Sequence, residues 1–368
     1  MNILVTGADG FIGKNLVAHL NKNDKFSVSS FTCEDSINSL FNLVEQAGAV
    51  IHLAGENRPI DVSAFNTVNV DLTKKLCDAI RATGRQISLI LSSSIQADMN
   101  NPYGKSKRAA EDIVKQLAKE TGNPVYIYRL PNVFGKWCKP NYNSVVATFC
   151  YNIANNLPIH VSDELKNLKL VYVDDVVSDF LRVIQNHIRG FSMLTVEPEY
   201  SITLGQLAGQ INAFKNSRKT LISERVGAGL VRALYSTYLS YIPPDQFAYE
   251  LSKNRDERGV FVEMLKTKDS GQFSYFTTHP GVTRGGHYHQ SKTEKFIVIK
   301  GSAQFKFRHI ITNEKYEIFT SGDKPQVVET SPGWAHNITN VGENEMFVMI
   351  WANEIYNSKR PDTIDSEI

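Results

Sequence analysis

A tyrosine and a lysine stand four residues apart at Tyr103 and Lys107, shortly after a run of serines that ends with Ser93 and Ser94. Residues at i and i+4 are neighbours on one face of a helix, so the phenol and the ammonium group can lie side by side. A free phenol is a poor acid or base at neutral pH, but a nearby cation favours its ionised form. A serine hydroxyl can hold the reacting oxygen. The spacing therefore predicts a proton relay of Tyr103, Lys107 and either Ser93 or Ser94.

Three glycines, Gly7, Gly10 and Gly13, follow the apolar segment 3–6 and precede a helix-like segment. Glycines at these positions allow a tight turn and a close approach of the backbone to a pyrophosphate, whose charge rests on the N–H groups that open the helix. The strand before the turn and the helix after it are the context that such a site needs. We therefore expect these glycines, with Phe11 and Ile12, to bind a nicotinamide dinucleotide.

The second strand lacks one expected feature of a dinucleotide site. An acidic residue that binds the ribose 2′-hydroxyl of NAD should lie about 20 residues beyond the glycine turn. The candidate strand 26–31 instead ends in Thr32 and Cys33, and Glu34 and Asp35 come only after them. The residues therefore leave the choice between NAD and NADP open.

Five of the nine histidines lie in the last third of the chain. Among them, His287 and His289 precede Glu294, and His336 follows some forty residues later. Residues i and i+2 of a strand point to the same face, so His287 and His289 can reach one ion. Three imidazoles and a carboxylate suit Zn²⁺, and also iron, manganese or nickel, with water completing the shell. This pattern predicts a divalent metal centre.

The hydrophobic pattern indicates which elements position these groups. Up to about residue 241, short apolar runs alternate with helical periodicity, which is typical of a Rossmann-like, doubly wound parallel sheet. Beyond Pro243, strands follow one another with turns between them, as in an all-β jelly-roll barrel. We therefore expect an α/β domain at 1–243 and an all-β barrel at 244–368. The expected strands are 3–6, 26–31, 49–53, 87–91, 125–130, 261–265, 273–278, 295–299, 303–307 and 346–351, and the expected helices include 14–20 and 105–120.

Length, charge and cysteine content restrict the class of protein. The chain has 368 residues, more than the roughly 250–300 at which a single core stops growing, so two domains are expected. A formal net charge of +2 gives no field that would attract nucleic acid. No apolar run approaches a membrane span and the N-terminus has no signal-peptide pattern. The four scattered cysteines are interpreted as reduced thiols, which predicts a cytoplasmic location.

The first two thirds of the chain resemble the extended branch of the short-chain dehydrogenases/reductases, whose usual substrates are nucleotide sugars. Besides the glycine turn and the tyrosine–lysine pair, the resemblance rests on the segments HLAG at 52–55, RLPNVFG at 129–135 and YVDD at 172–175. It implies that Leu53, Ala54 and Gly55 line the cofactor and that Asn132 contacts the substrate. In the dehydratases of this branch an Asp-Glu pair follows the catalytic hydroxyl. Here Ile95 and Gln96 follow Ser94, which disfavours a 4,6-dehydratase.

The last third resembles the cupins, through the spacing Gly281-x5-His287-x-His289-x4-Glu294 and a second segment that ends in His336. The second segment lacks the usual residue between its proline and its glycine. Over the full length, the chain resembles the CapF type of bifunctional capsular polysaccharide and O-antigen enzymes. That resemblance implies UDP-2-acetamido-2,6-dideoxy-4-hexulose as the substrate and a homodimer. It also implies inversion of C3 in the barrel and reduction of C4 with NADPH, which gives UDP-2-acetamido-2,6-dideoxy-L-talose on the way to UDP-N-acetyl-L-fucosamine.

Other interpretations fit the same residues. The barrel can be a non-catalytic module that binds sugar or forms a dimer, and metal removal would then spare the chemistry. A nucleotide-sugar 4-epimerase that retains NAD has the same relay, and a redox-sensing binding protein without turnover is a third possibility. The base that would remove the C3 proton is left open among Tyr288, Lys295 and His309.

Overall fold

The computed structural model describes residues 1–185 and 190–368, and the chain divides into two compact units. One comprises Met1–Ile211 and Arg232–Ile242, and the other comprises Asn212–Val231 and Pro243–Ile368. The sequence predicts a division between residues 243 and 244, whereas the structure groups part of the preceding segment with the barrel. The reason is local pairing, because the N–H of Lys266 donates to the Leu221 carbonyl at 2.7 Å.

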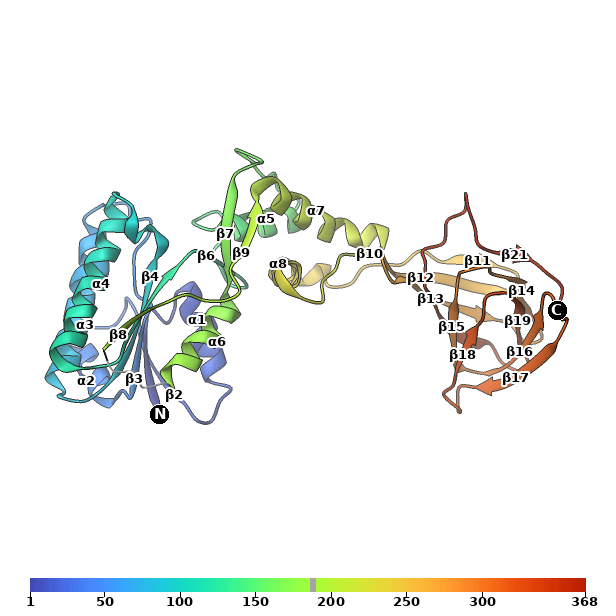
Figure 1. Ribbon diagram of the computed structural model, residues 1–368, viewed down its shortest axis with the longest axis horizontal. Coiled ribbons are helices and arrows are strands. Elements are labelled where there is room, and N and C mark those ends of the chain that lie inside the picture. The colour runs from blue at the N-terminus through green and yellow to red at the C-terminus, as the bar shows by residue number, and fades with distance from the viewer. Residues whose placement is uncertain (186–189) are drawn as a thin grey trace. The chain divides into compact units, whose positions relative to one another are not determined.

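A parallel sheet with helices on both faces forms the centre of the first unit. In spatial order its strands are β2 (Ser27–Phe31), β1 (Asn2–Thr6), β3 (Ala49–His52), β4 (Ser88–Ser94), β5 (Val125–Leu130) and β8 (Phe191–Leu194). The helices on it are α1 (Phe11–Leu20), α2 (Ile37–Gln46), α3 (Leu72–Ala82), α4 (Pro102–Thr121) and α6 (Val173–Ile184). Helices α2, α3 and α4 cover one face and α1 and α6 the other, each over its own apolar cluster (Figure 1). The inner strands β1, β3, β4 and β5 are mostly buried, as is usual in parallel sheets that helices cover on both faces, and the predicted doubly wound sheet is confirmed.

The order of the strands reverses at β1, which has β2 on one side and β3 on the other. In open α/β sheets, ligands bind outside the carboxyl ends of the strands at such a point. The glycine turn follows β1 and the segment 53–55 follows β3, so both predicted cofactor segments lie there. A Cβ on Gly7 would come within 2.7 Å of the Ala54 backbone nitrogen, and Gly7 has a φ of +68°. Only glycine allows these two loops to approach so closely.

The remaining elements of the chain before the barrel are short or lie beside the main sheet. A small sheet contains β6 (Asn132–Phe134), β7 (Asn167–Tyr172) and β9 (Tyr200–Thr203), with β6 parallel and β9 antiparallel to β7. The other elements are η1 (Phe65–Asp71), η2 (Ile95–Asp98), α5 (Val145–Ala154), α7 (Leu204–Thr220), β10 (Ile222–Ser223), α8 (Gly229–Leu239) and η3 (Pro244–Gln246).

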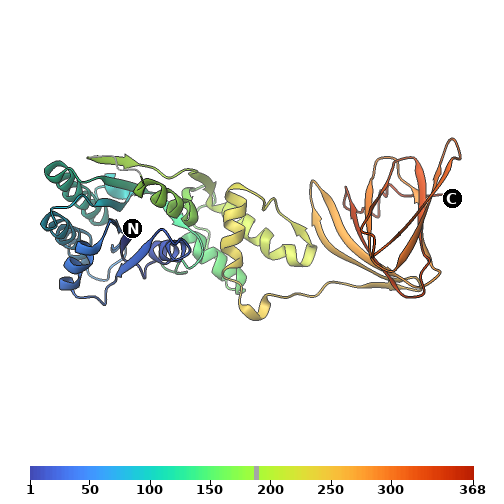
Figure 2. The same ribbon diagram turned by 90° about the horizontal axis from the view of Figure 1, so that it is seen from below.

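The barrel of the second unit consists of two largely antiparallel sheets that face each other (Figure 2). One sheet has the order β10, β12 (Gly259–Thr267), β13 (Gly271–Thr278), β20 (Met346–Ala352), β15 (Glu294–Lys300) and β18 (Val327–Thr330), with β11 (Asn254–Asp256) paired to β12. The other has the order β17 (Lys315–Ser321), β16 (Ser302–His309), β19 (Trp334–Asn340), β14 (Thr283–Tyr288) and β21 (Ile364–Asp365). Residues of β16 alternate between buried and less buried positions, as a strand with one face on a core requires. The predicted all-β barrel is confirmed.

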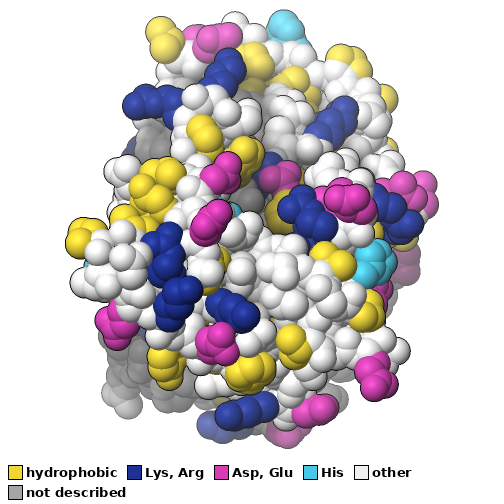
Figure 3. Space-filling model, turned by 90° about the vertical axis from the view of Figure 1, so that its right-hand side faces the viewer, with side chains coloured by type: hydrophobic (Ala, Val, Ile, Leu, Met, Phe, Trp, Pro, Cys, Tyr) yellow, Lys and Arg dark blue, Asp and Glu magenta, His cyan; other side chains and the backbone are white. Residues whose placement is uncertain are grey.

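Among the described residues, no helix is both long and apolar enough to span a bilayer. On the face of the barrel seen in Figure 3, basic and acidic side chains are interspersed with apolar ones. All four cysteines are free thiols, and three of them are buried.

Candidate functional site

The start of α1 has free backbone donors at the predicted pyrophosphate position. Gly10 caps the helix without a side-chain hydrogen bond, and the first intrahelical bond runs from the Lys14 N–H to the Gly10 carbonyl at 2.9 Å. The N–H groups of the first turn therefore lack helical acceptors, and the positive end of the helix dipole adds to their attraction for an anion. A Cβ on Gly13 would lie 2.2 Å from the Gly7 carbonyl oxygen. The turn thus fits a dinucleotide phosphate.

Helix α4 presents the predicted relay because its first turn is fixed from two sides. The side chain of Asn101 caps the helix by accepting the Gly104 N–H at 2.7 Å. Gly104 packs directly on η2, where a Cβ would meet the Gln96 carbonyl oxygen at 2.2 Å. This contact brings Tyr103 to Ser94, whose hydroxyl hydrogen-bonds with the phenol. Burial raises the pKa of Tyr103, and the bond to Ser94 partly offsets that rise.

The structure separates the two candidate serines. Neighbouring residues on a strand point to opposite faces, so only one of them can meet Tyr103. Ser94 does so, while Ser93 is buried and donates to the Glu111 carboxylate at 2.6 Å.

Lys107, the cation of the predicted relay, lies next to the predicted cofactor segment 53–55. Its ammonium group is buried and donates to the Ser92 carbonyl at 2.8 Å. A Cβ on Gly55 would lie 3.4 Å from Lys107 Nζ, so the ammonium lies against the predicted cofactor segment 53–55. Burial lowers the pKa of Lys107 to about 8, and the Glu111 carboxylate partly opposes that shift.

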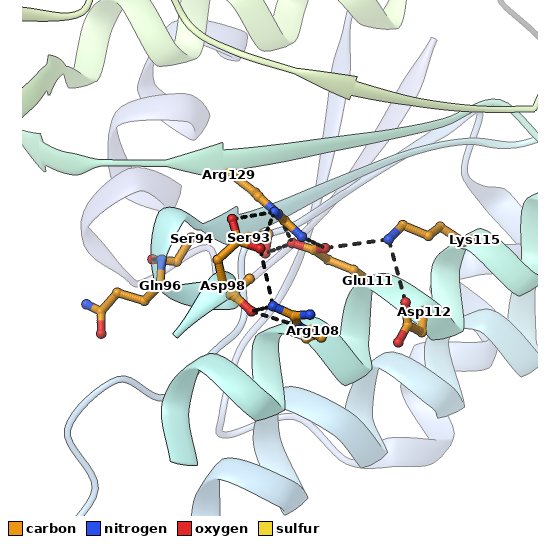
Figure 4. A network of polar contacts seen from close by, with 10 residues as sticks. Ser93, Ser94, Gln96, Asp98, Arg108, Glu111, Asp112, Lys115 and Arg129 are labelled. Atoms are coloured by element: carbon orange, nitrogen blue, oxygen red, sulfur yellow. Dashed lines mark hydrogen bonds and ion pairs between the residues drawn. The ribbon is translucent and has the colours of Figure 1, made fainter. Parts of the chain in front are cut away.

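A buried ion network supports the relay from behind (Figure 4). Glu111 is fully buried one helical turn beyond Lys107, and Arg129 donates to it through Nε at 2.9 Å and Nη2 at 2.8 Å. Arg129 also donates to the Asp98 carboxylate at 2.8 Å. Burial opposes ionisation of Glu111, but the hydrogen bonds from Arg129 and Ser93 hold its pKa below the usual range. Sequence reasoning missed Glu111, although its i+4 spacing from Lys107 places it on the same helix face.

The buried Glu111 carboxylate predicts a large loss of stability on neutralisation. Glu111→Gln leaves the Arg129 guanidinium without its buried counter-ion, which is expected to lower the free energy of unfolding by about 3–5 kcal/mol. Asp112→Asn is the matched control, because Asp112 is an exposed neighbour paired with Lys115 at 3.5 Å, and about 0–1 kcal/mol is expected there. Urea unfolding followed by the helical circular dichroism measures both. Equal losses in the two variants would contradict the assignment.

Two further buried polar residues hold the loop after β3. Asn69 accepts the Glu56 N–H at 2.8 Å and donates to the Ser106 hydroxyl at 2.9 Å, so it ties this loop to α4. His52 lies between the hydroxyls of Thr6 and Thr73, at 2.6 and 2.9 Å. Burial and, to a lesser extent, Lys107 lower the pKa of His52 to about 3, so its ring is neutral. Asn69 is the buried residue of η1, and sequence reasoning did not indicate it.

Asn132, the predicted substrate contact, begins β6 and is exposed. Its amide donates to the Lys169 carbonyl at 3.1 Å, and the described contacts do not join it to the relay. The same segment continues to Gly135, which packs on Val173 so closely that a Cβ would lie 2.4 Å from that side chain. The segments RLPNVFG and YVDD are therefore neighbours, as the parallel pairing of β6 with β7 requires.

The four predicted metal ligands converge in the barrel. His287 on β14 pairs with His336 on β19, and Glu294 begins β15. The ligand atoms of these residues and His289 lie within 4.8 Å of one another. The Nε2 atoms of His289 and His336 lie 3.3 and 3.4 Å from the same oxygen of Glu294. The four side chains that the sequence predicts as metal ligands therefore lie together.

The donor set fits a divalent ion. The Nε2 atoms of His289 and His336 are buried and have no hydrogen-bond partner, although they face the carboxylate. Their Nδ1 atoms face the backbone carbonyls of Asp362 and Trp334, which fixes the tautomer that leaves Nε2 free to bind a metal. Burial lowers the pKa of His287 to about 4, so this ring is neutral at physiological pH. The His287 ring is therefore in the neutral form that binds a metal ion.

The surroundings of the ligands include residues that the sequence did not indicate. Lys292 donates to the second oxygen of Glu294 at 2.6 Å. The Asp362 carboxylate accepts the N–H groups of Gln290, Ser291 and Lys292, which hold its pKa well below the usual range. Asp362, in the C-terminal segment, thus holds in place the loop 290–292 between the ligands His289 and Glu294.

A cavity of about 580 Å³ opens beside the cluster. His287, Glu294, His336 and Lys292 line it together with an apolar wall of phenylalanine and isoleucine side chains. The candidate bases Tyr288, Lys295 and His309 are not among the lining residues. Lys295 forms an ion pair with Glu329, and the His309 ring packs on Trp334 at 5.0 Å between centroids.

Comparisons with known proteins cover both units. Residues 3–193 match the NAD dependent epimerase/dehydratase family, and residues 254–364 match the polysaccharide biosynthesis C-terminal domain. A UDP-2-acetamido-2,6-beta-L-arabino-hexul-4-ose reductase of Pseudomonas aeruginosa is 55% identical over 99% of this chain and 98% of its own length.

Solved structures give the same result. The crystal structure of the capsular polysaccharide assembling protein CapF from Staphylococcus aureus superposes with a TM-score of 0.93, at 42% identity and with all of both chains covered. A UDP-glucuronic acid 4-epimerase from Bacillus cereus, solved in complex with NAD, shares only the fold, at 18% identity, a TM-score of 0.56 and 66% coverage of this chain against 98% of its own. The chain therefore belongs to the NAD dependent epimerase/dehydratase family and, over its whole length, to the CapF-like proteins that carry a polysaccharide biosynthesis C-terminal domain.

Proposed function

We propose that this chain is a bifunctional nucleotide-sugar enzyme. Its first unit reduces the C4 ketone of UDP-2-acetamido-2,6-dideoxy-4-hexulose with NADPH, and its barrel epimerises C3 of the same sugar. The observation that carries the proposal is the pairing of Tyr103 with Ser94, with Lys107 on the same helix beside Gly55, in a chain 55% identical to a UDP-4-keto-sugar reductase. NADP rather than NAD, zinc as the metal, a homodimer and a cytoplasmic location are parts of the proposal that rest on the resemblance.

The reduction needs a hydride and a proton, and the chain's own residues handle the proton. NADPH, held by the glycine turn and by the segment 53–55, supplies the hydride when bound. Ser94 holds the ketone oxygen by a hydrogen bond, and the Tyr103 hydroxyl gives its proton to that oxygen as C4 becomes tetrahedral. The Lys107 ammonium stabilises the phenolate that remains. Ser93 contributes indirectly, because its bond to Glu111 fixes the strand end.

The epimerisation takes place beside the four ligands of the barrel. A divalent ion held by His287, His289, Glu294 and His336 supplies a Lewis acid when bound. The proton on C3 is acidified by the neighbouring ketone; its loss to a base leaves an enolate, and addition of a solvent-derived proton to the opposite face of C3 inverts the centre. Lys292 keeps one oxygen of Glu294 engaged, so that the other faces the imidazoles. The apolar wall of the cavity limits the access of water.

One experiment tests both halves. The protein is incubated with NADPH and the 4-keto UDP-sugar in deuterated water, with and without a chelator, and the product is examined by NMR. Deuterium at C3 that the chelator abolishes, together with consumption of NADPH, supports both activities. Consumption of NADPH without label at C3 would leave the barrel without a catalytic role, and no consumption would contradict the reductase.

The pKa of Lys107 predicts how the reduction depends on pH. Because burial lowers this pKa to about 8, the ammonium loses its proton as the pH rises through that value. The phenolate of Tyr103 then lacks its cation, so kcat/KM for NADPH oxidation is expected to fall above about pH 8. Burial raises the pKa of Tyr103, so ionisation of the tyrosine itself does not cause this fall in kcat/KM. A pH series measures it, and a profile that stays flat to pH 10 would contradict the role of Lys107.

A further inference from the structure

Three arginines lie at the exposed end of the barrel cavity, on the side of the β11–β12 hairpin. Arg255 and Arg258 are exposed, whereas the Arg284 side chain is only 13% exposed. All three line the cavity that contains the metal ligands. The acidic residue among them is Asp256, which pairs with Arg258 at 2.6 Å and lies 3.4 Å from Arg284. The Asp256 carboxylate is therefore the counter-ion of both Arg258 and Arg284, and the cluster of three arginines and one aspartate has a net positive charge.

Arg284 faces this cavity because of a bulge in β14. In a regular strand, residues 284 and 287 would point to opposite faces. The register between β14 and β19 shifts between Gly285 and His287, and both Gly285 and Gly286 have positive φ, +100° and +83°. The extra residue returns Arg284 to the face of His287. The remaining steps along the strand, at about 3.3 Å each, place Arg284 roughly 7–10 Å from His287 along the backbone.

The protein holds the Arg284 guanidinium in place without using all of its donors. The group stacks on Phe276 at 5.4 Å, Nε donates to the Thr278 hydroxyl at 3.3 Å, and Nη2 reaches Asp256. A guanidinium has five N–H donors in a fixed fork that matches phosphate oxygens. A largely buried cation with an incomplete counter-ion is costly, and an anionic ligand would lower that cost.

We propose that Arg255, Arg258 and Arg284 form a subsite that binds the diphosphate of a nucleotide sugar while its sugar ring lies at the four metal ligands. The inference deepens the proposed function and rests on it for the identity of the sugar. The phosphate end of such a ligand meets the cationic rim, and the apolar wall of the cavity faces the sugar. The barrel thereby binds the diphosphate of the substrate through its own residues, independently of the reductase unit.

Calorimetric titration of UDP into the metal-loaded, full-length protein, saturated with NADPH, tests the subsite. The wild type is expected to bind about one UDP more per chain than the variant Arg255→Gln/Arg284→Gln, because the variant lacks two of the three guanidinium groups that would face the diphosphate. Lys306→Gln is the matched control, because Lys306 lies on β16 with its side chain 43% exposed and outside the cavity lining. This control is expected to bind UDP as the wild type does.

Two further measurements separate the possible failures. Uridine lacks the diphosphate, so the wild type and the double variant should bind it alike. Arg255→Gln alone, at an exposed edge strand that tolerates substitution, is expected to weaken the second UDP site by at least tenfold, with unchanged metal content. If the double variant binds UDP with the stoichiometry and affinity of the wild type, the proposed subsite is wrong. If the double variant loses the UDP site and the wild type never incorporates deuterium at C3, the subsite is upheld and the epimerase activity is refuted.

Discussion

Tyr103→Phe is expected to lower kcat for NADPH oxidation by roughly 10²–10⁴-fold, the usual contribution of a positioned general acid. The substitution removes the phenolic proton and keeps the ring, which packs near Phe65 at 5.8 Å between centroids. Binding of NADPH should persist, because the glycine turn and Lys107 are unchanged. Stopped-flow absorbance at the NADPH band measures the rate, and fluorescence titration measures binding. Turnover that survives at the wild-type rate would remove Tyr103 from the mechanism.

A pair of serine variants sharpens this result. Ser94→Ala removes the hydroxyl that meets Tyr103 and is expected to lower kcat roughly 10- to 100-fold, the effect of losing one hydrogen bond to a developing charge. Ser93→Ala removes a donor to the buried Glu111 and is expected to reduce stability rather than kcat. If Ser93→Ala is the slower enzyme, the assignment of the two hydroxyls is reversed.

The sequence predicted the segments that act through local geometry. The glycine turn was predictable because each glycine meets a steric demand of a strand, a turn and a helix, and a Cβ on Gly7 or Gly13 would collide with backbone. The i+4 spacing of Tyr103 and Lys107 likewise needs only one helix. The choice between Ser93 and Ser94 was not predictable, because it depends on where β4 ends and on the packing of Gly104 against η2.

Residues that act through long-range contacts or irregular strands escaped prediction. Glu111 acquires its role from Arg129, and Lys292 from Glu294, whose position depends on the barrel. Simple alternation would have turned Arg284 away from His287, and the bulge at Gly285 reverses that expectation. The second cupin motif lacks one residue before Gly333, which has a φ of +78°, and His336 nevertheless lies 3.4 Å from the Glu294 carboxylate.

The proposed metal centre predicts a second large effect, confined to one activity. His336→Ala removes a ligand, and exchange of the C3 proton with solvent is expected to fall by roughly 10²–10³-fold, since a Lewis acid contributes several kcal/mol. Reduction of a substrate that already has the inverted C3 should continue at the wild-type rate, because the relay does not involve the barrel. Metal analysis should show an ion in the wild type and little in the variant.

His309→Ala is the matched control for His336→Ala, because it removes an imidazole from the same barrel outside the cavity lining. We expect it to keep both the metal and the exchange at C3, and the same variant tests His309 as a candidate base. If His336→Ala loses its metal but still labels C3, then the ion is structural and the cavity residues alone perform the inversion. If His336→Ala loses reduction of the inverted substrate as well, the barrel contributes to both steps, and the assignment of one reaction to each unit is wrong.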